Sequence, residues 1–308
     1  MTLSVFDLHC DTAERMLLEH QGLSKNDFAV SLEQAKKFDR YIQVMAHYID
    51  HSLSEEDGWQ RFLAMRQNLL EDPAVKDGNA TVALKCPKDL MRPSLILSLE
   101  DARILANRID RVDTLYRLGI RIITPLWADT SCIGGAHNVN LGLTDFGKAA
   151  LGKALELGII LDISHASIAS AEDMLELAAL HKAPIIASHS NAYSVCPVSR
   201  NLRDGQVQSI LDRKGLIGLN FYKHFLRADG GAKIADILRH AEHFLSLGAR
   251  DALCLGGDMD GCELPKELPS LSSLDALANA MLAHNYTEDL VRAIFFENAY
   301  RFAQKHLK

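Results

Sequence analysis

Near its start the chain reads Leu3-Ser4-Val5-Phe6-Asp7-Leu8-His9-Cys10-Asp11-Thr12, an apolar run that leads directly into potential metal ligands. Side chains alternate between the two faces of a β-strand, so we expect His9 and Asp11 on one face and Cys10 packed on the other. An imidazole nitrogen beside a carboxylate oxygen suits zinc and similar divalent ions. A capped strand end would also explain this one pair, but the same event recurs along the chain.

Further apolar runs of strand length follow at 42–48, 95–99, 120–126, 159–163, 184–188, 215–222 and 252–256. Amphipathic stretches predict helices over 57–70, 101–118, 144–157, 166–181, 204–214 and 233–247, and a terminal helix over 287–307. The runs are continuously apolar rather than alternating, which indicates strands covered on both faces, as in a parallel sheet. Eight strand–helix units in 308 residues predict a closed (β/α)₈ TIM barrel of the metal-dependent hydrolase type.

A doubly wound open sheet is the alternative fold, but its first turn is normally rich in glycine, and here that turn is His-Cys-Asp-Thr. No repeat or flexible linker divides the sequence, so we expect a single domain over residues 1–308. The segment 260–273, with Pro265 and Pro269, is predicted to be a loop that forms a wall of the site.

The composition excludes several classes of function. With 33 Lys and Arg against 40 Asp and Glu, the net charge of −7 argues against a nucleic-acid partner. The apolar stretches are too short for a transmembrane helix, and no secretory signal is visible. Six scattered cysteines without a Cys-x-x-Cys pair indicate reduced thiols, so we expect a cytoplasmic protein without a membrane partner.

Ionisable residues follow the ends of five predicted strands. Barrel enzymes place their reactive residues at the carboxyl ends of the strands. The residues are His9 and Asp11, Glu100 and Asp101, Asp162 and His165, His189, and Asp258 and Asp260. Buried ionisable groups are costly unless they are paired or bound to metal, which argues against coincidence. Asp101 is better explained as a cap of the following helix, and Asp260 as a turn residue.

Three histidines and two carboxylates are enough for two metal ions, about 3.5–4 Å apart, that share a bridging ligand. Some two-metal barrels use a carboxylated lysine as the bridge, but the run 120–126 contains no lysine, which leaves Glu100 as the candidate. A metal-bridging hydroxide would be the nucleophile. Asp258 is placed to shuttle the proton to the leaving amine. Arg200 is either a solvated loop charge or a clamp for a substrate carboxylate.

Several motifs in order resemble the membrane (renal) dipeptidase family of binuclear zinc metallopeptidases. They are Asp-Leu-His-Cys-Asp-Thr at 7–12, Leu-Ser-Leu-Glu at 97–100, Gly-Leu-Thr-Asp-Phe-Gly at 142–147, Leu-Asp-Ile-Ser-His at 161–165, Ser-His-Ser-Asn-Ala-Tyr-Ser-Val-Cys at 188–196, Ser-Arg-Asn at 199–201, Asn-Phe-Tyr at 220–222 and Gly-Gly-Asp-Met-Asp-Gly at 256–261. The resemblance runs from residue 7 to the C-terminal helix, and together the motifs are highly specific.

The resemblance implies a (β/α)₈ barrel that hydrolyses dipeptides, tolerates a D-residue on their C-terminal side and forms a homodimer. One zinc ion would be bound by His9, Asp11 and the bridging Glu100, and the second by Glu100, His165 and His189. Arg200 looks like the residue that grips the substrate's carboxylate, and Asp258 like the proton-transferring acid and base. The family's signal peptide and lipid anchor are not visible here.

One position departs from the mammalian pattern. Those enzymes carry a histidine after the fourth strand that helps to stabilise the tetrahedral intermediate, and this chain has Trp127 there, as bacterial members do. Tryptophan donates one hydrogen bond but cannot carry a proton charge. Loss of such a donor can cost about 10²–10³ in rate. His137 in the same loop is a weaker substitute, and His47 and His51 belong to no motif.

The sequence therefore predicts a zinc-dependent dipeptidase with two zinc ions per chain, acting on L-Xaa-L-Xaa and L-Xaa-D-Xaa dipeptides. Arg200 and a metal-bound free amine would measure the substrate at its two ends. One alternative is a related two-metal barrel hydrolase that acts on a lactam, a lactone or another non-peptide substrate. Another is a catalytically silent metal-binding homologue, disabled by Trp127.

Overall fold

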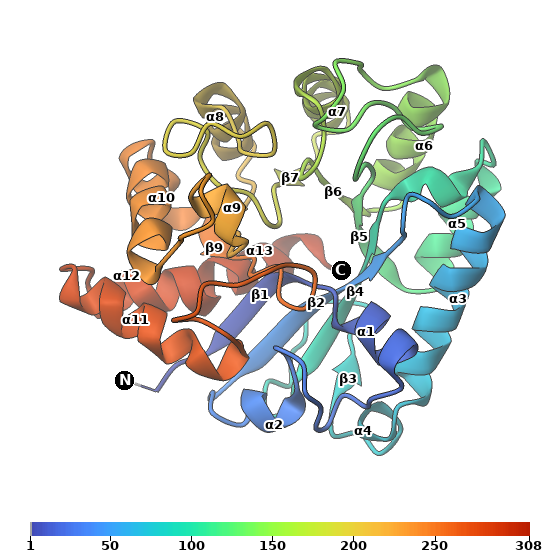
Figure 1. Cartoon of the computed structure of the whole chain (residues 1–308). Coiled ribbons are helices and arrows are strands. Elements are labelled where there is room, and N and C mark those ends of the chain that lie inside the picture. Colours follow the sequence, from blue (N-terminus) through green and yellow to red (C-terminus); the bar gives the residue numbers. More distant parts are fainter. Residues whose placement is uncertain (1) are drawn as a thin grey trace.

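The computed structural model describes residues 2–308 and shows a parallel sheet of nine strands that curls into a nearly closed barrel (Figure 1). The strands are β1 (Val5–Cys10), β2 (Tyr41–Tyr48), β3 (Thr81–Val82), β4 (Ser94–Glu100), β5 (Ile120–Thr124), β6 (Ile160–Asp162), β7 (Ile185–Ile186), β8 (Ile217–Leu219) and β9 (Leu253–Leu255). Their order is β7-β6-β5-β4-β2-β1-β9-β8, with β3 paired outside to β4. A single bridge between Ala187 and Ile217 joins the two ends. The predicted (β/α)₈ barrel is confirmed.

Helices surround the barrel on its outside (Figure 1). They are α1 (Thr12–Glu19), α2 (Leu32–Ala35), α3 (Glu55–Glu71), α4 (Pro73–Lys76), α5 (Asp110–Arg117), α6 (Asp145–Glu156), α7 (Ile168–Leu180), α8 (Asp204–Asp212), α9 (Lys223–Leu226), α10 (Ile234–Ser246), α11 (Leu274–Ala283), α12 (Glu288–Arg292) and α13 (Asn298–His306). Short 3₁₀ turns lie at Ala102–Leu105, Ala249–Asp251 and Leu271–Ser273, and a π-helical stretch at Ala293–Glu297 joins α12 to α13.

Most predicted helices are confirmed to within two or three residues, but the single helix predicted over 101–118 is wrong. The structure has a 3₁₀ turn there, then α5. Ala106 and Asn107 interrupt the helix because both adopt left-handed backbone angles, with φ of 50° and 57°. Asp101 does cap the 3₁₀ turn, since its carboxylate accepts a hydrogen bond from the Arg103 amide at 3.0 Å. The sequence patterns missed α1, α2, α4, α9 and α11.

The amino-terminal half of the barrel interior is apolar, and we call it the closed end. It is formed by Phe6, Ile42, Val44, Ile96, Ile122, Ile160, Ile186 and Cys254 from the strands, by Leu216 immediately before β8, and by Phe296, Ala299 and Ala303 from the C-terminal helical segment. These side chains leave a cavity of only about 10 Å³. Burial on this scale supplies much of the free energy that holds the barrel together. The opposite, carboxyl-terminal end of the interior is polar.

Strand β1 reaches that polar end through an irregularity. Its pairing with β2 shifts register between Asp7 and Cys10, so β1 carries a bulge. Leu8 still packs in the closed end, while His9 turns toward the carboxyl-terminal end. Cys10 is buried, as expected, in a separate apolar core that lies between the strands and the outer helices. Bulges of this kind commonly re-aim a side chain next to an active site.

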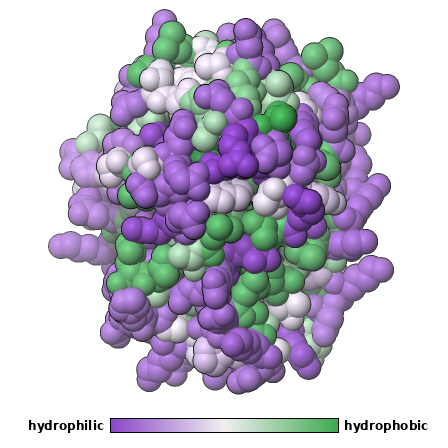
Figure 2. Space-filling model, turned by 90° about the vertical axis from the view of Figure 1, so that its right-hand side faces the viewer, coloured by the Kyte–Doolittle hydropathy of each residue, from purple (hydrophilic) through white to green (hydrophobic). Residues whose placement is uncertain are grey.

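The face of the molecule that Figure 2 shows is mostly hydrophilic, with apolar residues gathered in limited areas. No helix within residues 2–308 combines the length and the apolar character that crossing a membrane requires.

Candidate metal centre

The structure brings the five predicted ligands together at the carboxyl-terminal end of the barrel. His9 Nε2 lies 3.4 Å from Asp11 Oδ2 and 3.3 Å from Glu100 Oε2. The other oxygen of Glu100, Oε1, lies 3.1 Å from His165 Nε2 and 3.4 Å from His189 Nε2. Each oxygen of Glu100 therefore faces a different set of donors, which is the arrangement that a bridging carboxylate needs.

These donors fit divalent cations better than they fit one another. His165 Nε2 and His189 Nε2 face each other at 2.9 Å, although two neutral imidazoles can share at most one proton there. Within residues 2–308, His9 Nε2, Asp11 Oδ1 and Glu100 Oε1 are buried without a hydrogen-bond partner. Buried polar atoms without partners are costly, and a nitrogen–oxygen donor set is typical of zinc.

Three groups of donor atoms, each within 4.8 Å of one another, share members of this set. They are His9, Asp11 and Glu100; Glu100, His165 and His189; and His9, His189 and Asp258. The first two are the two ligand sets that the family resemblance implied. The third shows that Asp258 lies beside the same centre, with a carboxylate oxygen within 4.8 Å of ring nitrogens of His9 and His189.

The electrostatics of the centre keep two histidines neutral, the form that binds metal. Burial and the charge of Arg200 lower the pKa of His165 to about 4. Burial and the charge of His9 hold the pKa of His189 well below its usual range. Burial raises the pKa of Asp258 to about 7, because only His9 and a hydrogen bond counteract the cost of its charge. A carboxyl group with such a pKa can both accept and return a proton near neutral pH.

His189 is oriented by Asp162, at the end of β6. Asp162 Oδ1 accepts hydrogen bonds from the amides of Ser164 and Ser188, both at 2.9 Å, and Oδ2 accepts from Thr124 Oγ1 at 2.6 Å. The Ser188 hydroxyl also bonds to Asp162, and it lies 2.6 Å from His189 Nδ1. Ligating histidines usually have such an outer partner on the other ring nitrogen, which fixes the ring's orientation.

Backbone geometry positions the remaining groups. The Asp7 carboxylate accepts from the amides of His9 at 2.9 Å and Gly257 at 3.1 Å, which ties the bulged β1 to β9. His165 Nδ1 donates to the Trp127 carbonyl at 3.2 Å. His165 and Asp258 both have left-handed backbone angles, with φ of 67° and 55°, which ordinary residues rarely adopt.

Asp258 lines the cavity at this centre, whereas Arg200 is buried and does not line it. Asp258 Oδ2 accepts a hydrogen bond from Asn220 Nδ2 at 2.9 Å and faces the cavity described below. Arg200 lies close to the cavity wall, with its guanidinium carbon 5.5 Å from the ring centroid of Phe225. Its Nη1 donates to Ser190 Oγ at 2.8 Å and its Nη2 to the His189 carbonyl at 2.9 Å, whereas Nε has no partner within residues 2–308.

A cavity of about 610 Å³ opens above the five ligands. Aromatic rings from Tyr48, Trp127, Tyr222 and Phe225 form much of its wall. Its acidic side chains are Asp11, Glu14, Glu100, Asp258, Asp260 and Glu263, and its lining contains no lysine or arginine. Such a cavity accommodates a small substrate.

The loop after the last strand forms part of this wall, as predicted, through residues 260–263. Asp260 has the structural role expected of it. Its Oδ2 accepts from Thr12 Oγ1 at 2.6 Å, and its Oδ1 accepts from the Ala29 amide at 2.7 Å and contacts Arg15.

Sequence reasoning missed three residues of the wall, namely Glu14, Tyr48 and Phe225. Tyr48 is the last residue of β2, and Glu14 follows Asp11 by one helical turn. Their closeness to the carboxyl ends of strands could have identified both as residues of the site. Among the unassigned histidines, His47 points away from the site and bonds to the Ser98 carbonyl, while the ring of His51 lies 5.1 Å from that of Trp127.

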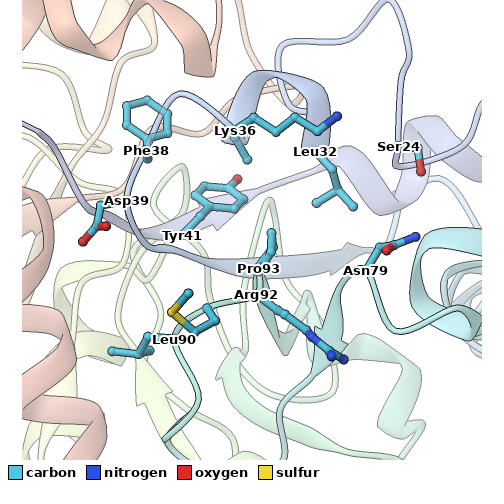
Figure 3. A pocket seen from close by; sticks show the side chains of 12 residues that line it. Ser24, Leu32, Lys36, Phe38, Asp39, Tyr41, Asn79, Leu90, Arg92 and Pro93 are labelled. Atoms are coloured by element: carbon cyan, nitrogen blue, oxygen red, sulfur yellow. The ribbon is translucent and has the colours of Figure 1, made fainter.

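His137 lies next to the centre. Its ring is 6.0 Å from that of His165, and its Nδ1 lies 2.9 Å from Ser199 Oγ. A separate cavity of about 400 Å³ lies at the amino ends of β2 and β4, with Phe38, Tyr41 and Arg92 in its lining (Figure 3). It contains none of the candidate ligands.

The model of the membrane dipeptidase family, peptidase family M19, matches residues 1–306. The chain belongs to this family. An uncharacterized protein in the pqqA 5′ region of Klebsiella pneumoniae is 31% identical over 199 residues, which is 61% of this chain and 72% of that protein.

Two solved structures resemble this M19 metallo-dipeptidase over nearly their whole length. Dipeptidase AC, a metallopeptidase of family M19, is 28% identical with a TM-score of 0.91, covering 100% of this chain and 99% of its own. A metallopeptidase from Rhodobacter sphaeroides, liganded with a phosphinate mimic of the dipeptide L-Ala-D-Ala, is 27% identical with a TM-score of 0.91, covering 99% and 100%. The prediction of a metal-dependent dipeptidase is therefore confirmed.

Proposed function

We propose that this M19 dipeptidase binds two zinc ions and hydrolyses L-Xaa-L-Xaa and L-Xaa-D-Xaa dipeptides. The observation that carries the proposal is the position of Glu100, whose two oxygens face separate sets of donors at 3.1–3.4 Å. The L-Ala-D-Ala mimic bound by the Rhodobacter sphaeroides relative supports the second substrate class.

Different residues of the chain have different roles in the proposed reaction. His9 and Asp11 would hold one ion, His165 and His189 the other, and Glu100 both. When bound, the ions supply Lewis-acid polarisation of the carbonyl and lower the pKa of water. The outer partners of the histidines keep the rings in place, so that little reorganisation is needed during the reaction.

Asp258 is the proposed proton carrier. It borders the cavity next to His9 and His189, and Asn220 fixes one of its oxygens at 2.9 Å, which leaves Oδ1 for the attacking water and the departing amine. Because its pKa is raised to about 7, it can take a proton and return it at neutral pH. General acid–base catalysis of this kind contributes roughly 10²–10⁴-fold.

Arg200 and Trp127 are the proposed substrate contacts. Among residues 2–308, no lysine or arginine lines the cavity, and the guanidinium of Arg200 next to its wall residue Phe225 is the proposed positive charge for a substrate carboxylate. Within the same residues its Nε–H has no hydrogen-bond partner, whereas Nη1 and Nη2 are already engaged. Trp127 lies in the wall with its ring 5.9 Å from that of His165, where its indole N–H can donate to the substrate.

The test is metal analysis of the purified protein together with kinetics on L-Ala-L-Ala, L-Ala-D-Ala and N-acetyl-L-Ala-L-Ala. We expect two zinc ions per chain and hydrolysis of both free dipeptides but not of the acetylated one. Arg200→Lys keeps the charge but lacks both the Nε–H donor and the bonds to Ser190 and His189 that fix the group, and it should raise KM for dipeptides about tenfold or more. Hydrolysis of blocked or longer peptides at the same rate, or an unchanged KM in this variant, would reject the two-ended recognition.

The homodimer and the cytoplasmic location stay proposals that rest on the family resemblance and on the composition. Sedimentation of the metal-loaded protein checks the first, and fractionation of cells that express the chain checks the second.

A further inference from the structure

Glu14 is an acid of the cavity wall that the proposed reaction does not use. It lies in the first turn of α1, three residues after Asp11, so it stands next to the ligand set of His9, Asp11 and Glu100. Its side chain is 20% exposed and borders the cavity. The carboxylate therefore faces the space that a substrate enters.

The usual structural role of an acid at this position is absent. A glutamate in the first helical turn commonly folds back to the backbone amide of the residue that caps the helix. Here α1 has no side-chain cap, and the Asp11 amide instead donates to the Met259 carbonyl at 3.0 Å. Within residues 2–308 the Glu14 carboxylate makes no hydrogen bond. Its one ionic neighbour is Arg61 Nη1, at 3.9 Å.

The other acids of the cavity either have protein partners or belong to the candidate ligand set. Asp260 contacts Arg15, Glu263 is paired with Lys223, Asp258 accepts from Asn220, and Asp11 and Glu100 belong to the ligand groups. Glu14 is thus the acid whose charge is least compensated, and burial with the charge of Asp11 raises its pKa to about 7. A cation brought by the substrate would relieve that cost.

The side of the cavity on which Glu14 lies fixes which part of a dipeptide reaches it. Glu14 follows Asp11 along the chain. Asp11 Oδ2 lies 3.4 Å from His9 Nε2, which faces Glu100 Oε2. Arg200 Nη2 instead donates to the carbonyl of His189, whose ring faces Glu100 Oε1. The two groups therefore lie toward different oxygens of Glu100. If Arg200 attracts the substrate's carboxylate, the amino-terminal residue lies toward Glu14.

We propose that Glu14 selects dipeptides whose amino-terminal residue carries a cationic side chain, lysine or arginine. The proposal rests on the proposed function. The carboxylate is the specific anchor, and the aromatic ring of Tyr48 in the same wall accommodates the aliphatic part of such a side chain.

The experiment compares kcat/KM for Lys-Ala, Ala-Lys, Ala-Ala and Glu-Ala in the metal-loaded enzyme. We expect Lys-Ala to be preferred over Ala-Ala, and Glu14→Gln to lower the ratio of the two about fivefold to tenfold without a matching loss on Ala-Lys. Glu14→Lys should turn the preference toward Glu-Ala. Glu19→Gln is the matched control, because Glu19 lies on the same helix, outside the cavity, and should leave the ratio unchanged.

A binding measurement separates this proposal from the proposed function. Calorimetric titration with phosphinate dipeptide analogues that begin with lysine or alanine should show the same selectivity and the same loss in Glu14→Gln. An unchanged ratio, or an equal loss on all four dipeptides, overturns the role of Glu14. A wild-type enzyme that cleaves no dipeptide overturns the proposed function instead, and the titration still decides whether Glu14 binds the cationic residue.

Discussion

The two ends of the barrel interior are built from the same face of the same strands, yet their side chains have opposite chemistry. In β4, Ile96 packs into the closed end, and Glu100, four residues later on the same face, lies among the metal ligands. In β1, a bulge separates Leu8, which packs in the closed end, from His9, which lies among the metal ligands. A distance of one to four residues along a strand therefore separates the part that stabilises the barrel from the part that costs stability.

This contrast shows which end of the barrel contributes favourably to the free energy of folding. The closed end buries aliphatic and aromatic groups with almost no cavity, which is favourable by itself. The opposite end buries three histidines and several carboxylates, and within residues 2–308 one polar atom each of His9, Asp11 and Glu100 lacks a hydrogen-bond partner, which is unfavourable until cations are bound. Four substitutions test whether the two ends contribute to stability and function independently.

Glu100→Gln should have the largest effect, and on function alone. It keeps the size of the side chain but removes the charge that faces both donor sets. We expect fewer than two bound metal ions and a loss of kcat/KM of about 10³-fold or more, with the metal-free protein no less stable than the parent. Elemental analysis, kinetics and urea unfolding measure the three quantities. Full metal content with activity within tenfold of the parent would contradict the bridging role.

Phe296→Ala should have the converse effect. Phe296 is buried in the closed end, with its ring 6.3 Å from that of Phe6. Removal of a buried phenylalanine costs about 3–5 kcal/mol. We expect urea unfolding to show this loss in free energy, while metal content and KM stay near those of the parent. A large fall in metal affinity would show that the two ends are not independent.

The pH dependence of the free energy of unfolding separates the contribution of His47, a buried histidine outside the metal centre, from that of the ligands. Burial lowers the pKa of His47 to about 4, below the value of about 6.5 in the unfolded chain. The unfolded state therefore binds a proton first as the pH falls, so the free energy of unfolding is complete above pH 6.5 and declines down to about pH 4. Between pH 7 and 5 the loss from His47 should be about 2 kcal/mol.

His47→Gln should remove that part of the pH dependence in the metal-loaded and the metal-free protein alike, since His47 faces away from the ligands. Urea unfolding at pH 7 and pH 5 measures it. A decline that persists unchanged in the variant would assign the effect to other groups.

Asp162→Asn should have the smallest of the four effects. It weakens the link through Ser188 that orients His189, and loss of such an outer partner costs roughly 10–100-fold in metal affinity. Competition with a chelator measures the affinity. Ser188→Ala breaks the same link from its other side and should give a similar loss. An unchanged metal affinity in both variants would contradict the role of Asp162 in orienting His189.

Much of this division could be predicted from the sequence, because its signals are local. His9, Glu100, His165 and His189 each follow an apolar run, and a barrel brings the ends of such runs together. The break at Ala106 could not be predicted, since helical periodicity continues through it. The orienting role of Asp162 depends on the pairing of β6 with β7, which places Ser188 beside it. The burial of Arg200 likewise depends on loop packing.

The left-handed backbone at His165 and Asp258 limits how this family can vary. A branched side chain at either position would collide with its own main chain, and glycine would permit the angle but supply no functional group. Aspartate, asparagine and histidine tolerate such angles best among side chains that carry a donor or acceptor. In a saturation library, these two positions should therefore accept few replacements even when the substrate is changed, and new specificities should arise from the surrounding wall.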